Sequence, residues 1–375
     1  MNNNVFSYFG VTRDSPEWLD WKWQYSRRIT SVEALAHIIS LSEREKQEIQ
    51  ACLGSFKMAI TPYYASLMDP QDPACPVRMQ AVPSINETRV EPWAMKDPLS
   101  EDEDSPVPNI VHRYPDRVLF MVTRQCSMYC RHCLRKRHMG EEDFIISEAA
   151  KQKAIDYIAG TPQIRDVLVS GGDPLCMSDG ALEDILARLR AIEHVEVIRI
   201  GSRTPVVMPM RITPALLAML KKYHPLWMNV HFNHPREITE ESRRACAGIA
   251  DAGIPLGNQS VLLRGINDSV ATMKELLQKL VRARVRPYYI YQCDLCEGSE
   301  HFRTRVETGI EIIRSLTGNI SGFAIPRFVI DAPNGGGKIP LNPNFIVSLD
   351  DEKIEMRNFE GAVYAYPQPL VEMAH

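Results

Sequence analysis

The sequence predicts an α/β protein in which an open, partial (β/α) barrel follows a helical amino-terminal region. Two observations predict the barrel. From about residue 117 short apolar runs alternate with amphipathic stretches of helical periodicity, and polar residues recur where the apolar runs end. Six or seven such units can be placed, which is fewer than the eight of a closed barrel, so an open barrel is expected.

The helical region ends at a change in composition near residue 105. Residues 15–68 are amphipathic, and Ser42 followed by Glu45 has the spacing of a capping box. The stretch 97–108 is acidic and rich in proline, which is typical of a solvated linker. We therefore expect a helical accessory domain with its acidic linker over 1–105, the barrel over 106–345 and a short carboxyl-terminal segment over 346–375.

The barrel strands are expected at seven apolar runs, and helices fit between them. The expected strands are 117–123, 166–170, 195–201, 227–232, 256–263, 287–293 and 323–330. The clearest helices are 213–222, 239–252, 271–284 and 306–316. Because such sheets and barrels bind ligands at the carboxyl edge of their strands, we expect function to lie there.

Composition excludes several classes of protein. The chain is 45% hydrophobic and 24% charged, as in globular proteins, and its formal charge of -4 argues against a nucleic-acid partner. No apolar run is long enough to span a membrane, and the first residues lack the features of a signal peptide. Nine cysteines in such a chain indicate a reducing compartment, so cytoplasm is the expected location.

Three cysteines, Cys126, Cys130 and Cys133, follow the first expected strand within eight residues. Three thiolates at this spacing can hold a cubane iron–sulfur cluster and leave one iron without a protein ligand. Closed clusters and structural zinc sites need a fourth ligand, but Cys176 is distant in sequence and His132 adjoins Cys133, where side chains diverge. An open, reactive cluster is favoured over three structural thiols.

A glycine-rich loop carries a single lysine, Lys338, after the last expected strand. It is not a phosphate-binding P-loop, because Ala332 and Ile339 break that pattern. A lysine on such a turn can form a Schiff base with an aldehyde cofactor such as pyridoxal phosphate, if burial lowers its pKa. A solvated surface lysine fits the residues equally well, and both interpretations stay open here.

Other strand ends carry polar groups that could converge on one face. After 166–170 come Gly171, Gly172 and Asp173, where two glycines allow the backbone to approach a ligand closely, although an ordinary turn is the alternative. Gln259 and Asp294 belong to later strand ends. Each could be a satisfied core residue on its own, but several in register favour a site.

The stretch from Cys126 to Cys133 resembles the cluster motif of radical S-adenosylmethionine enzymes, although His132 stands where most have an aromatic residue. Together with the basic residues 135–137 it is similar to the lysine 2,3-aminomutase family, and so are segments 112–117, 199–205, 286–293 and 331–338. The similarity runs from near residue 16 to about 361. It implies a partial (β/α)6-type radical SAM barrel with an N-terminal helical domain and a short C-terminal extension.

The resemblance also implies cofactors. Cys126, Cys130 and Cys133 would bind a [4Fe–4S] cluster whose free iron chelates S-adenosylmethionine, and Lys338 would hold pyridoxal 5′-phosphate. Arg113 and Tyr114 would lie near the cofactor phosphate. The match further assigns cofactor binding to Gly171, Gly172, Asp173 and Gln259.

The implied substrate is an amino acid with a cationic end. Arg135 matches the arginine that pairs with the substrate carboxylate, and Asp294 and Asp331 match the acids that receive the distal ammonium of lysine, although each could be a solvated surface acid. The implied activity is that of an isomerase, a 2,3-aminomutase that interconverts L-lysine and L-β-lysine through a 5′-deoxyadenosyl radical. An aminomutase for arginine or ornithine, and a non-catalytic iron–sulfur scaffold or redox sensor, stay as alternatives.

The sequence departs from its relatives at a structural zinc site. Ser269 stands where those relatives have a zinc-ligand cysteine, and no cysteine follows Cys296, so no zinc is expected. Cys293 and Cys296 are expected to be reduced thiols rather than a redox pair. The expected partners are a low-potential electron donor of the flavodoxin or ferredoxin type and further copies of the chain, in a homo-oligomer unlike the zinc-linked form.

Overall fold

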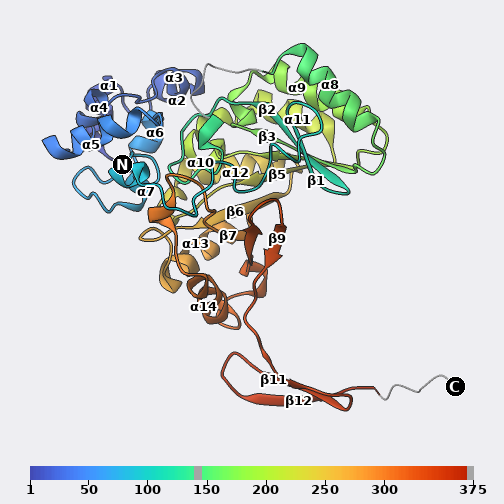
Figure 1. Cartoon of the computed structure of the whole chain (residues 1–375). Helices are drawn as coiled ribbons and strands as arrows, with labels where there is room; N and C mark the ends of the chain where they lie inside the picture. Colours follow the sequence, from blue (N-terminus) through green and yellow to red (C-terminus); the bar gives the residue numbers. More distant parts are fainter. Residues whose placement is uncertain (139–145, 370–375) are drawn as a thin grey trace.

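The computed structural model describes residues 1–138 and 146–369, and a nine-stranded sheet is its central feature (Figure 1). The strands are ordered β1 to β9 along the sheet as in the chain. Their bounds are β1 Ile110–Tyr114, β2 Arg117–Thr123, β3 Asp166–Gly171, β4 Val197–Gly201, β5 Leu226–Val230, β6 Leu256–Leu262, β7 Arg286–Gln292, β8 Arg327–Ala332 and β9 Gly337–Pro340. β2 to β8 run parallel, whereas β1 and β9 pair antiparallel at the two ends. No pairing joins β1 to β9 in the described residues, so the barrel is open.

The expected α/β fold with a partial barrel is confirmed. All seven expected strands are present as β2 to β8, and the largest shift is in β8, which begins at Arg327 because residues 322–324 form a 3-10 turn. The sequence analysis missed β1 and β9. β9 consists of Gly-Lys-Ile-Pro, which has no alternating apolar pattern, and it forms only because β8 offers it an edge.

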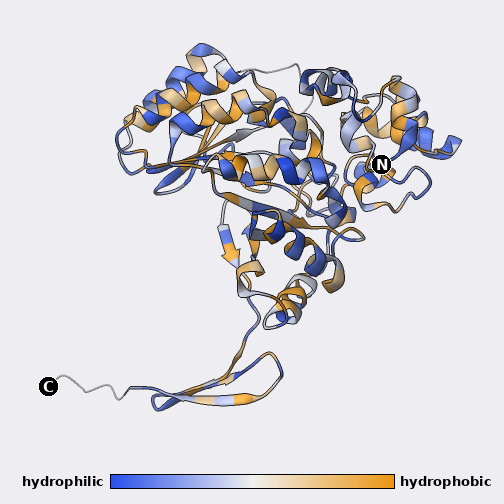
Figure 2. Cartoon of the chain, turned by 180° about the vertical axis from the view of Figure 1, so that it is seen from behind, coloured by the Kyte–Doolittle hydropathy of each residue, from blue (hydrophilic) through white to orange (hydrophobic). Residues whose placement is uncertain are grey.

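Helices connect the parallel strands and cover the sheet, and all but the short, fully buried α10 have exposed and buried residues. Their bounds are α8 Glu148–Ala159, α9 Asp179–Arg190, α10 Thr204–Val207, α11 Pro214–Leu220, α12 Glu240–Asp251, α13 Val270–Arg282 and α14 Val306–Leu316. In α13 the buried residues Met273, Leu276, Leu277 and Leu280 recur at helical spacing on one face. Figure 2 shows hydrophilic and hydrophobic residues alternating along these helices. Each fully buried aliphatic side chain of this kind stabilises the fold by about 1.5–3 kcal/mol.

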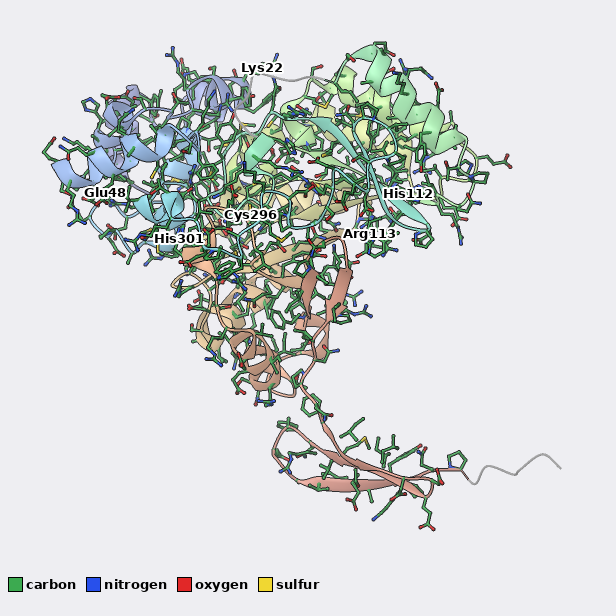
Figure 3. The ribbon with its side chains drawn as sticks, in the orientation of Figure 1. Lys22, Glu48, His112, Arg113, Cys296 and His301 are labelled. Atoms are coloured by element: carbon green, nitrogen blue, oxygen red, sulfur yellow. The ribbon has the colours of Figure 1, made fainter. Side chains whose placement is uncertain are left out.

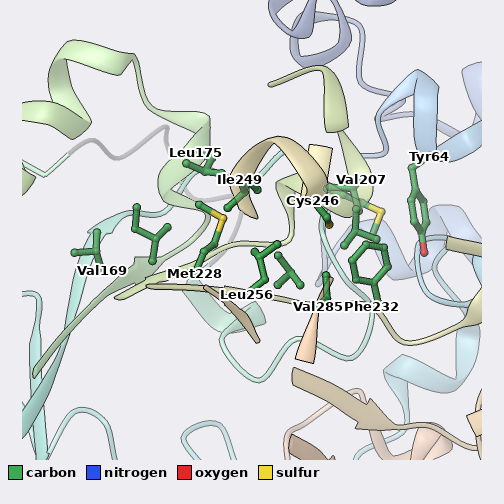
Figure 4. Packing of buried hydrophobic residues seen from close by; sticks show 14 of the residues in the cluster. Tyr64, Val169, Leu175, Val207, Met228, Phe232, Cys246, Ile249, Leu256 and Val285 are labelled. Carbon is green, nitrogen blue, oxygen red and sulfur yellow. The ribbon is translucent and has the colours of Figure 1, made fainter. Parts of the chain in front are cut away.

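The interior between sheet and helices is apolar and continuous. Met228 of β5 and Leu256 of β6 lie beside Cys246 and Ile249 of α12 (Figure 4), and all four are at most 5% exposed. This packing fixes the helices that follow each strand, and with them the loops at the carboxyl edge of the sheet.

Helix α14 packs closely on β8 through Gly309. A Cβ on Gly309 would lie 2.2 Å from Cζ of the fully buried Phe328. We expect Gly309→Ala to lower the free energy of unfolding by about 1–3 kcal/mol, because the ring cannot move without displacing β8. Chemical unfolding of the purified protein measures this.

The matched control is Gly180→Ala in α9, where a Cβ would meet nothing within 4 Å. That change should be neutral or stabilising by up to about 1 kcal/mol, because alanine is the better helix former. Equal unfolding midpoints for Gly309→Ala and wild type would contradict the close packing.

The first 88 residues are mainly short helices beside α10 and α12 (Figure 1). They are α1 Asn3–Phe9, α2 Pro16–Leu19, α3 Trp21–Ser26, α4 Val32–Ala36, α5 Glu43–Leu53, α6 Pro62–Ala65 and α7 Pro76–Met79. The capping box at Ser42 and Glu45 is confirmed. Trp18 and Tyr64 belong to the same buried cluster as the barrel residues, and Tyr64 donates a hydrogen bond to Glu237 at 2.7 Å. The proposed domain boundary near residue 105 stays a prediction.

The acidic segment 97–105 differs from the expected solvated linker. Asp97 and Asp102 both pair with Arg137, at 3.0 and 3.1 Å, and Glu101 is only 4% exposed. The backbone N–H of Asn334 donates to Pro98 O at 3.2 Å. The segment therefore contacts the loop after the cysteines through ion pairs and the glycine-rich loop through a backbone hydrogen bond.

The carboxyl-terminal residues form a second, three-stranded sheet that stands away from the barrel (Figure 1). Its strands are β10 Ile346–Leu349, β11 Lys353–Arg357 and β12 Val363–Pro367. Several of its apolar side chains are exposed, among them Leu349 at 61% and Tyr366 at 65%. Among the helices of residues 1–138 and 146–369, none is long and apolar enough to cross a membrane.

Candidate active site

The three clustered cysteines lie in the loop that leaves β2 at the carboxyl edge of the sheet. The backbone N–H of Cys133 donates to Cys130 O at 3.1 Å, which turns the loop. Between them Arg131 is almost fully buried. It donates three hydrogen bonds of 2.5–3.2 Å to Glu87 and another to Lys57 O at 2.8 Å. The amino-terminal region therefore holds the cysteine loop in place through a buried, charge-assisted pair.

The environment of Cys126 and Cys133 disfavours free thiolates. Although each keeps some exposed surface, burial raises the pKa of Cys133 to about 11, and the charge of Cys130 adds to it. Burial also raises the pKa of Cys126, with contributions from Cys176, Asp173, Cys133 and Cys130. These mutual effects mean that the three sulfurs lie close together. Cys176 also interacts electrostatically with Cys126, which the sequence spacing did not indicate.

Arg203, at the end of β4, touches this group directly. Its Nη1 lies 2.8 Å from the sulfur of Cys130, and its Nη2 donates to Glu237 at 2.8 Å. Burial would lower the pKa of Arg203, but the charges of Cys130, Tyr64 and Glu237 outweigh it and keep the guanidinium charged. A buried cation therefore faces a cysteine sulfur, a contact that sequence analysis missed.

Gly171 and Gly172 bring β3 against the cysteine loop. Gly171 has φ 117°, and a Cβ on Gly172 would lie 2.3 Å from Gln125 O. The backbone N–H of Gly172 donates to Thr123 O at 2.6 Å. The two glycines are needed for this approach of two backbone segments, whereas the sequence analysis explained them by the approach of a ligand.

Asp173 is 4% exposed and its carboxylate is fully engaged. It accepts hydrogen bonds from Ser202 Oγ at 2.7 Å and from the backbone N–H groups of Leu175, Arg203 and Thr204 at 2.9–3.1 Å. Burial raises the pKa of Asp173. The side chain thus joins the loops after β3 and β4, and a direct cofactor contact for Asp173, Gly171 or Gly172 stays a prediction.

Lys338 and Asp331 face each other across the β8–β9 pair. They are cross-strand partners, and Lys338 Nζ lies 3.0 Å from Asp331 Oδ1. The lysine side chain is 32% exposed, whereas that of Asp331 is 8% exposed. The backbone N–H of Lys338 donates to Tyr114 OH at 2.9 Å, so β1 supports the glycine-rich loop. The amine is therefore accessible and has a buried counter-charge.

Aromatic rings surround this lysine. Nζ lies 5.4 Å from the ring centre of Tyr291 and 6.0 Å from that of Tyr114. Gln259 Nε2 donates to Tyr291 OH at 3.2 Å, which places Gln259 on the same side of the barrel. Arg113, on β1 (Figure 3), keeps 43% of its side chain exposed and lies 3.8 Å from Asp104. The structure thus groups Tyr114 and Gln259 around Lys338, with Arg113 next to Tyr114.

Asp294 and Arg135 complete the charged cluster. Burial and the charge of Asp331 raise the pKa of Asp294 to about 7, and the cations Lys338 and Arg135 oppose this shift. Arg135 pairs with Glu101 through three hydrogen bonds of 2.6–3.1 Å. The charges of four predicted site residues therefore interact with one another. They are Lys338, Asp331, Asp294 and Arg135. Glu101 is a further member of this charged group that sequence analysis missed.

Comparison with known proteins identifies the family. The family described as Lysine-2,3-aminomutase matches residues 313–374, and the Radical SAM superfamily matches residues 120–279. The L-lysine 2,3-aminomutase of Clostridium subterminale is 58% identical over 370 residues, which cover 99% of this chain and 89% of that protein. This chain belongs to the lysine 2,3-aminomutase family. It is therefore a radical SAM enzyme of the isomerase class.

Two further relatives show the range of the aminomutase family. The L-lysine 2,3-aminomutase of Bacillus subtilis is 54% identical over 95% of this chain and 76% of its own length. The Glutamate 2,3-aminomutase of Clostridioides difficile is 48% identical over 92% of this chain and 82% of its own. Substrate preference therefore varies among proteins similar to this aminomutase.

The cofactors of the family are a [4Fe–4S] cluster, S-adenosylmethionine and pyridoxal phosphate, and the cysteine loop fits the first. In the described residues no three His, Cys, Asp or Glu side chains converge on one metal ion. A cubane cluster does not require this, because each cysteine binds a different iron. Coordination deprotonates a thiol whose pKa is otherwise high, and none of the nine cysteines is in a disulfide.

Unpaired groups beside the loop fit a polar ligand such as S-adenosylmethionine. His132 Nδ1 and His231 Nε2 are buried and have no hydrogen-bond partner in the described part of the chain. Burial holds the pKa of both imidazoles below the ordinary range, so both are neutral at pH 7. Buried polar groups are usually satisfied, and a ligand would satisfy these.

The surroundings of Lys338 fit pyridoxal phosphate. The amine is accessible, the rings of Tyr114 and Tyr291 flank it, and Arg113 on β1 has an exposed guanidinium. The individual roles of Arg113, Tyr114 and Gln259 stay predictions.

Proposed function

We propose that this enzyme interconverts L-lysine and L-β-lysine by moving the amino group between C2 and C3. The observation that carries the proposal is the position of Asp294 and Asp331 beside Lys338, with Arg135 in the same charged group. Two acids and an arginine in one charged group suit an amino acid with a carboxylate and a cationic side chain. A glutamate side chain would be repelled by the same two acids.

Each of the four charged residues of the site has a defined task in this proposal. When bound, the cluster and S-adenosylmethionine supply the 5′-deoxyadenosyl radical, and pyridoxal phosphate supplies the π system for the migration. Lys338 would hold the aldehyde cofactor through Nζ. Asp331, together with Asp294, would accept the distal ammonium of the substrate. Arg135 binds the carboxylate and so fixes the orientation of the substrate.

Product analysis tests the activity. The reconstituted, reduced enzyme is incubated without oxygen with L-lysine, L-arginine, L-ornithine or L-glutamate, and the β-amino acid formed is measured. We expect β-lysine from L-lysine at the highest kcat/KM. A higher value for arginine or ornithine would assign the enzyme to another cationic amino acid, and no β-amino acid despite reductive cleavage of S-adenosylmethionine would contradict the proposal.

The raised pKa of Asp294 predicts a pH-dependent affinity for substrate. An acid with a pKa of about 7 ionises as the pH rises through 7, so it is roughly one-tenth ionised at pH 6 and nine-tenths at pH 8. Lysine keeps its distal ammonium over this range. Affinity for L-lysine should therefore rise by about tenfold from pH 6 to pH 8, as measured by titration of the cofactor-loaded enzyme.

Asp294→Asn separates this effect from other titrations in the complex. The variant should bind L-lysine at least about tenfold more weakly at pH 8, because a charged hydrogen-bond acceptor is lost. The ratio of wild-type to variant affinity should shrink toward 1 at pH 6. A ratio that does not change with pH would refute the assignment to Asp294.

We also propose the partners and the location of the enzyme. The cluster requires a low-potential electron donor of the flavodoxin or ferredoxin type, and reduced cysteines favour the cytoplasm. The exposed apolar side chains of β10–β12 favour a homo-oligomer. The absence of zinc stays a prediction, which metal analysis of the purified enzyme tests.

A further inference from the structure

Glu101 is a buried acid whose carboxylate is directed at Arg135. Its side chain is 5% exposed, and its two oxygens accept three hydrogen bonds from Nε and Nη2 of Arg135, the shortest being 2.6 Å. Nη1 of Arg135 makes no hydrogen bond to the described residues. Glu101 therefore occupies the Nε and Nη2 edge of the guanidinium, whereas Nη1 is available to bind a ligand.

The turn that carries Glu101 is itself fixed. Asp97 accepts hydrogen bonds from the backbone N–H groups of Glu101 and Asp102, the latter at 3.0 Å. Ser105 Oγ donates to Glu101 O at 2.6 Å. Asp97 also pairs with Arg137, two residues after Arg135. The acid therefore does not depend on Arg135 for its position, as a support for a substrate-binding group requires.

A competing partner for Arg135 lies close by. Asp294 is half-buried, and the charges of Arg135 and Asp294 stabilise each other's ionised forms. A guanidinium on a flexible side chain pairs with the nearest available carboxylate, so without Glu101 the arginine would be drawn to Asp294. In such a pair Arg135 could no longer bind the substrate carboxylate, and Asp294 could no longer bind the distal ammonium of the substrate.

We propose that Glu101 is a positioning residue that holds Arg135 away from Asp294 and presents Nη1 to the substrate carboxylate. This inference rests on the proposed function, because it assumes that Arg135 binds a carboxylate. Glu101 touches neither substrate nor cofactor in this arrangement, and its effect on binding passes through Arg135.

The test measures binding by the anaerobic, cofactor-loaded enzyme. The probes are L-lysine and 1,5-diaminopentane, which has the same distal ammonium but no carboxylate. Glu101→Gln should weaken L-lysine binding by about tenfold or more and leave diaminopentane binding within about twofold of wild type. Glu101→Asp keeps the charge but withdraws the carboxylate, so it should weaken L-lysine binding by an intermediate factor. Glu103→Gln, an exposed acid in the same segment, is the matched control and should bind both probes as wild type does.

A double-mutant cycle shows whether Glu101 acts through Arg135. In the Arg135→Gln background the further change Glu101→Gln should alter L-lysine binding by less than about twofold. Iron and pyridoxal phosphate content are measured for each variant, and Glu101→Asp serves if Glu101→Gln does not fold. Unchanged L-lysine binding in Glu101→Gln or Glu101→Asp, with weakened binding in Arg135→Gln, overturns the positioning role alone. Unchanged binding in Arg135→Gln instead overturns the assignment of Arg135 in the proposed function.

Discussion

Replacement of Lys338 by alanine should abolish aminomutase activity and the visible absorbance of the lysine-bound cofactor. The reason is chemical: Nζ is the only accessible amine among the described residues that lies beside Asp331 and the rings of Tyr114 and Tyr291. Without it pyridoxal phosphate has no covalent attachment, and kcat should fall by more than about a thousandfold. Absorbance of the purified protein and β-lysine formation measure the two effects.

The same variant should keep its iron and still cleave S-adenosylmethionine when reduced. The cysteines lie in the loop after β2, whereas Lys338 is on β9, and no hydrogen bond joins the two in the described residues. Lys222→Ala is the matched control, because this lysine is 60% exposed and pairs with Glu183 on the surface. If Lys338→Ala retained the cofactor absorbance, another amine would hold pyridoxal phosphate.

Much of the barrel could be predicted because each of its parallel strands has a recognisable local sequence pattern. Buried parallel strands are short apolar runs between helices of clear periodicity, and β2 and α14 begin and end where the sequence predicts. β1, β9 and β10–β12 could not be predicted in the same way. They form at edges or on exposed sheets, where pairing with a neighbouring strand rather than burial decides the conformation.

The residues of the candidate site likewise fall into those with a recognisable local sequence pattern and those that only the fold brings together. Clustered cysteines and a lysine on a glycine turn have a recognisable spacing, so both could be found from the sequence. Glu101 could not, because it is one of several acids in segment 97–105 and only the fold shows which one is buried. Nor could Arg203, whose contact with Cys130 joins residues more than seventy positions apart in the chain.

Serine in place of Cys126, Cys130 or Cys133 should remove the iron–sulfur cluster. A serine oxygen is a poor substitute for a thiolate, so each variant should fall from about four irons per chain to a small fraction of that number. Aminomutase activity and reductive cleavage of S-adenosylmethionine should be lost together. Iron analysis and electron paramagnetic resonance of the reduced protein measure the loss.

Cys176 matters for the interpretation of that result, because this buried thiol interacts electrostatically with Cys126. The radical mechanism needs one iron without a protein ligand, so that S-adenosylmethionine can bind there. If Cys176 were a fourth ligand, the cluster would be closed and could only transfer electrons. Cys176→Ser should therefore keep its iron, its spectrum and its activity within about twofold of wild type. Loss of the cluster in Cys176→Ser would contradict the prediction that one iron has no protein ligand. It would also contradict the radical chemistry that the three-cysteine spacing predicts.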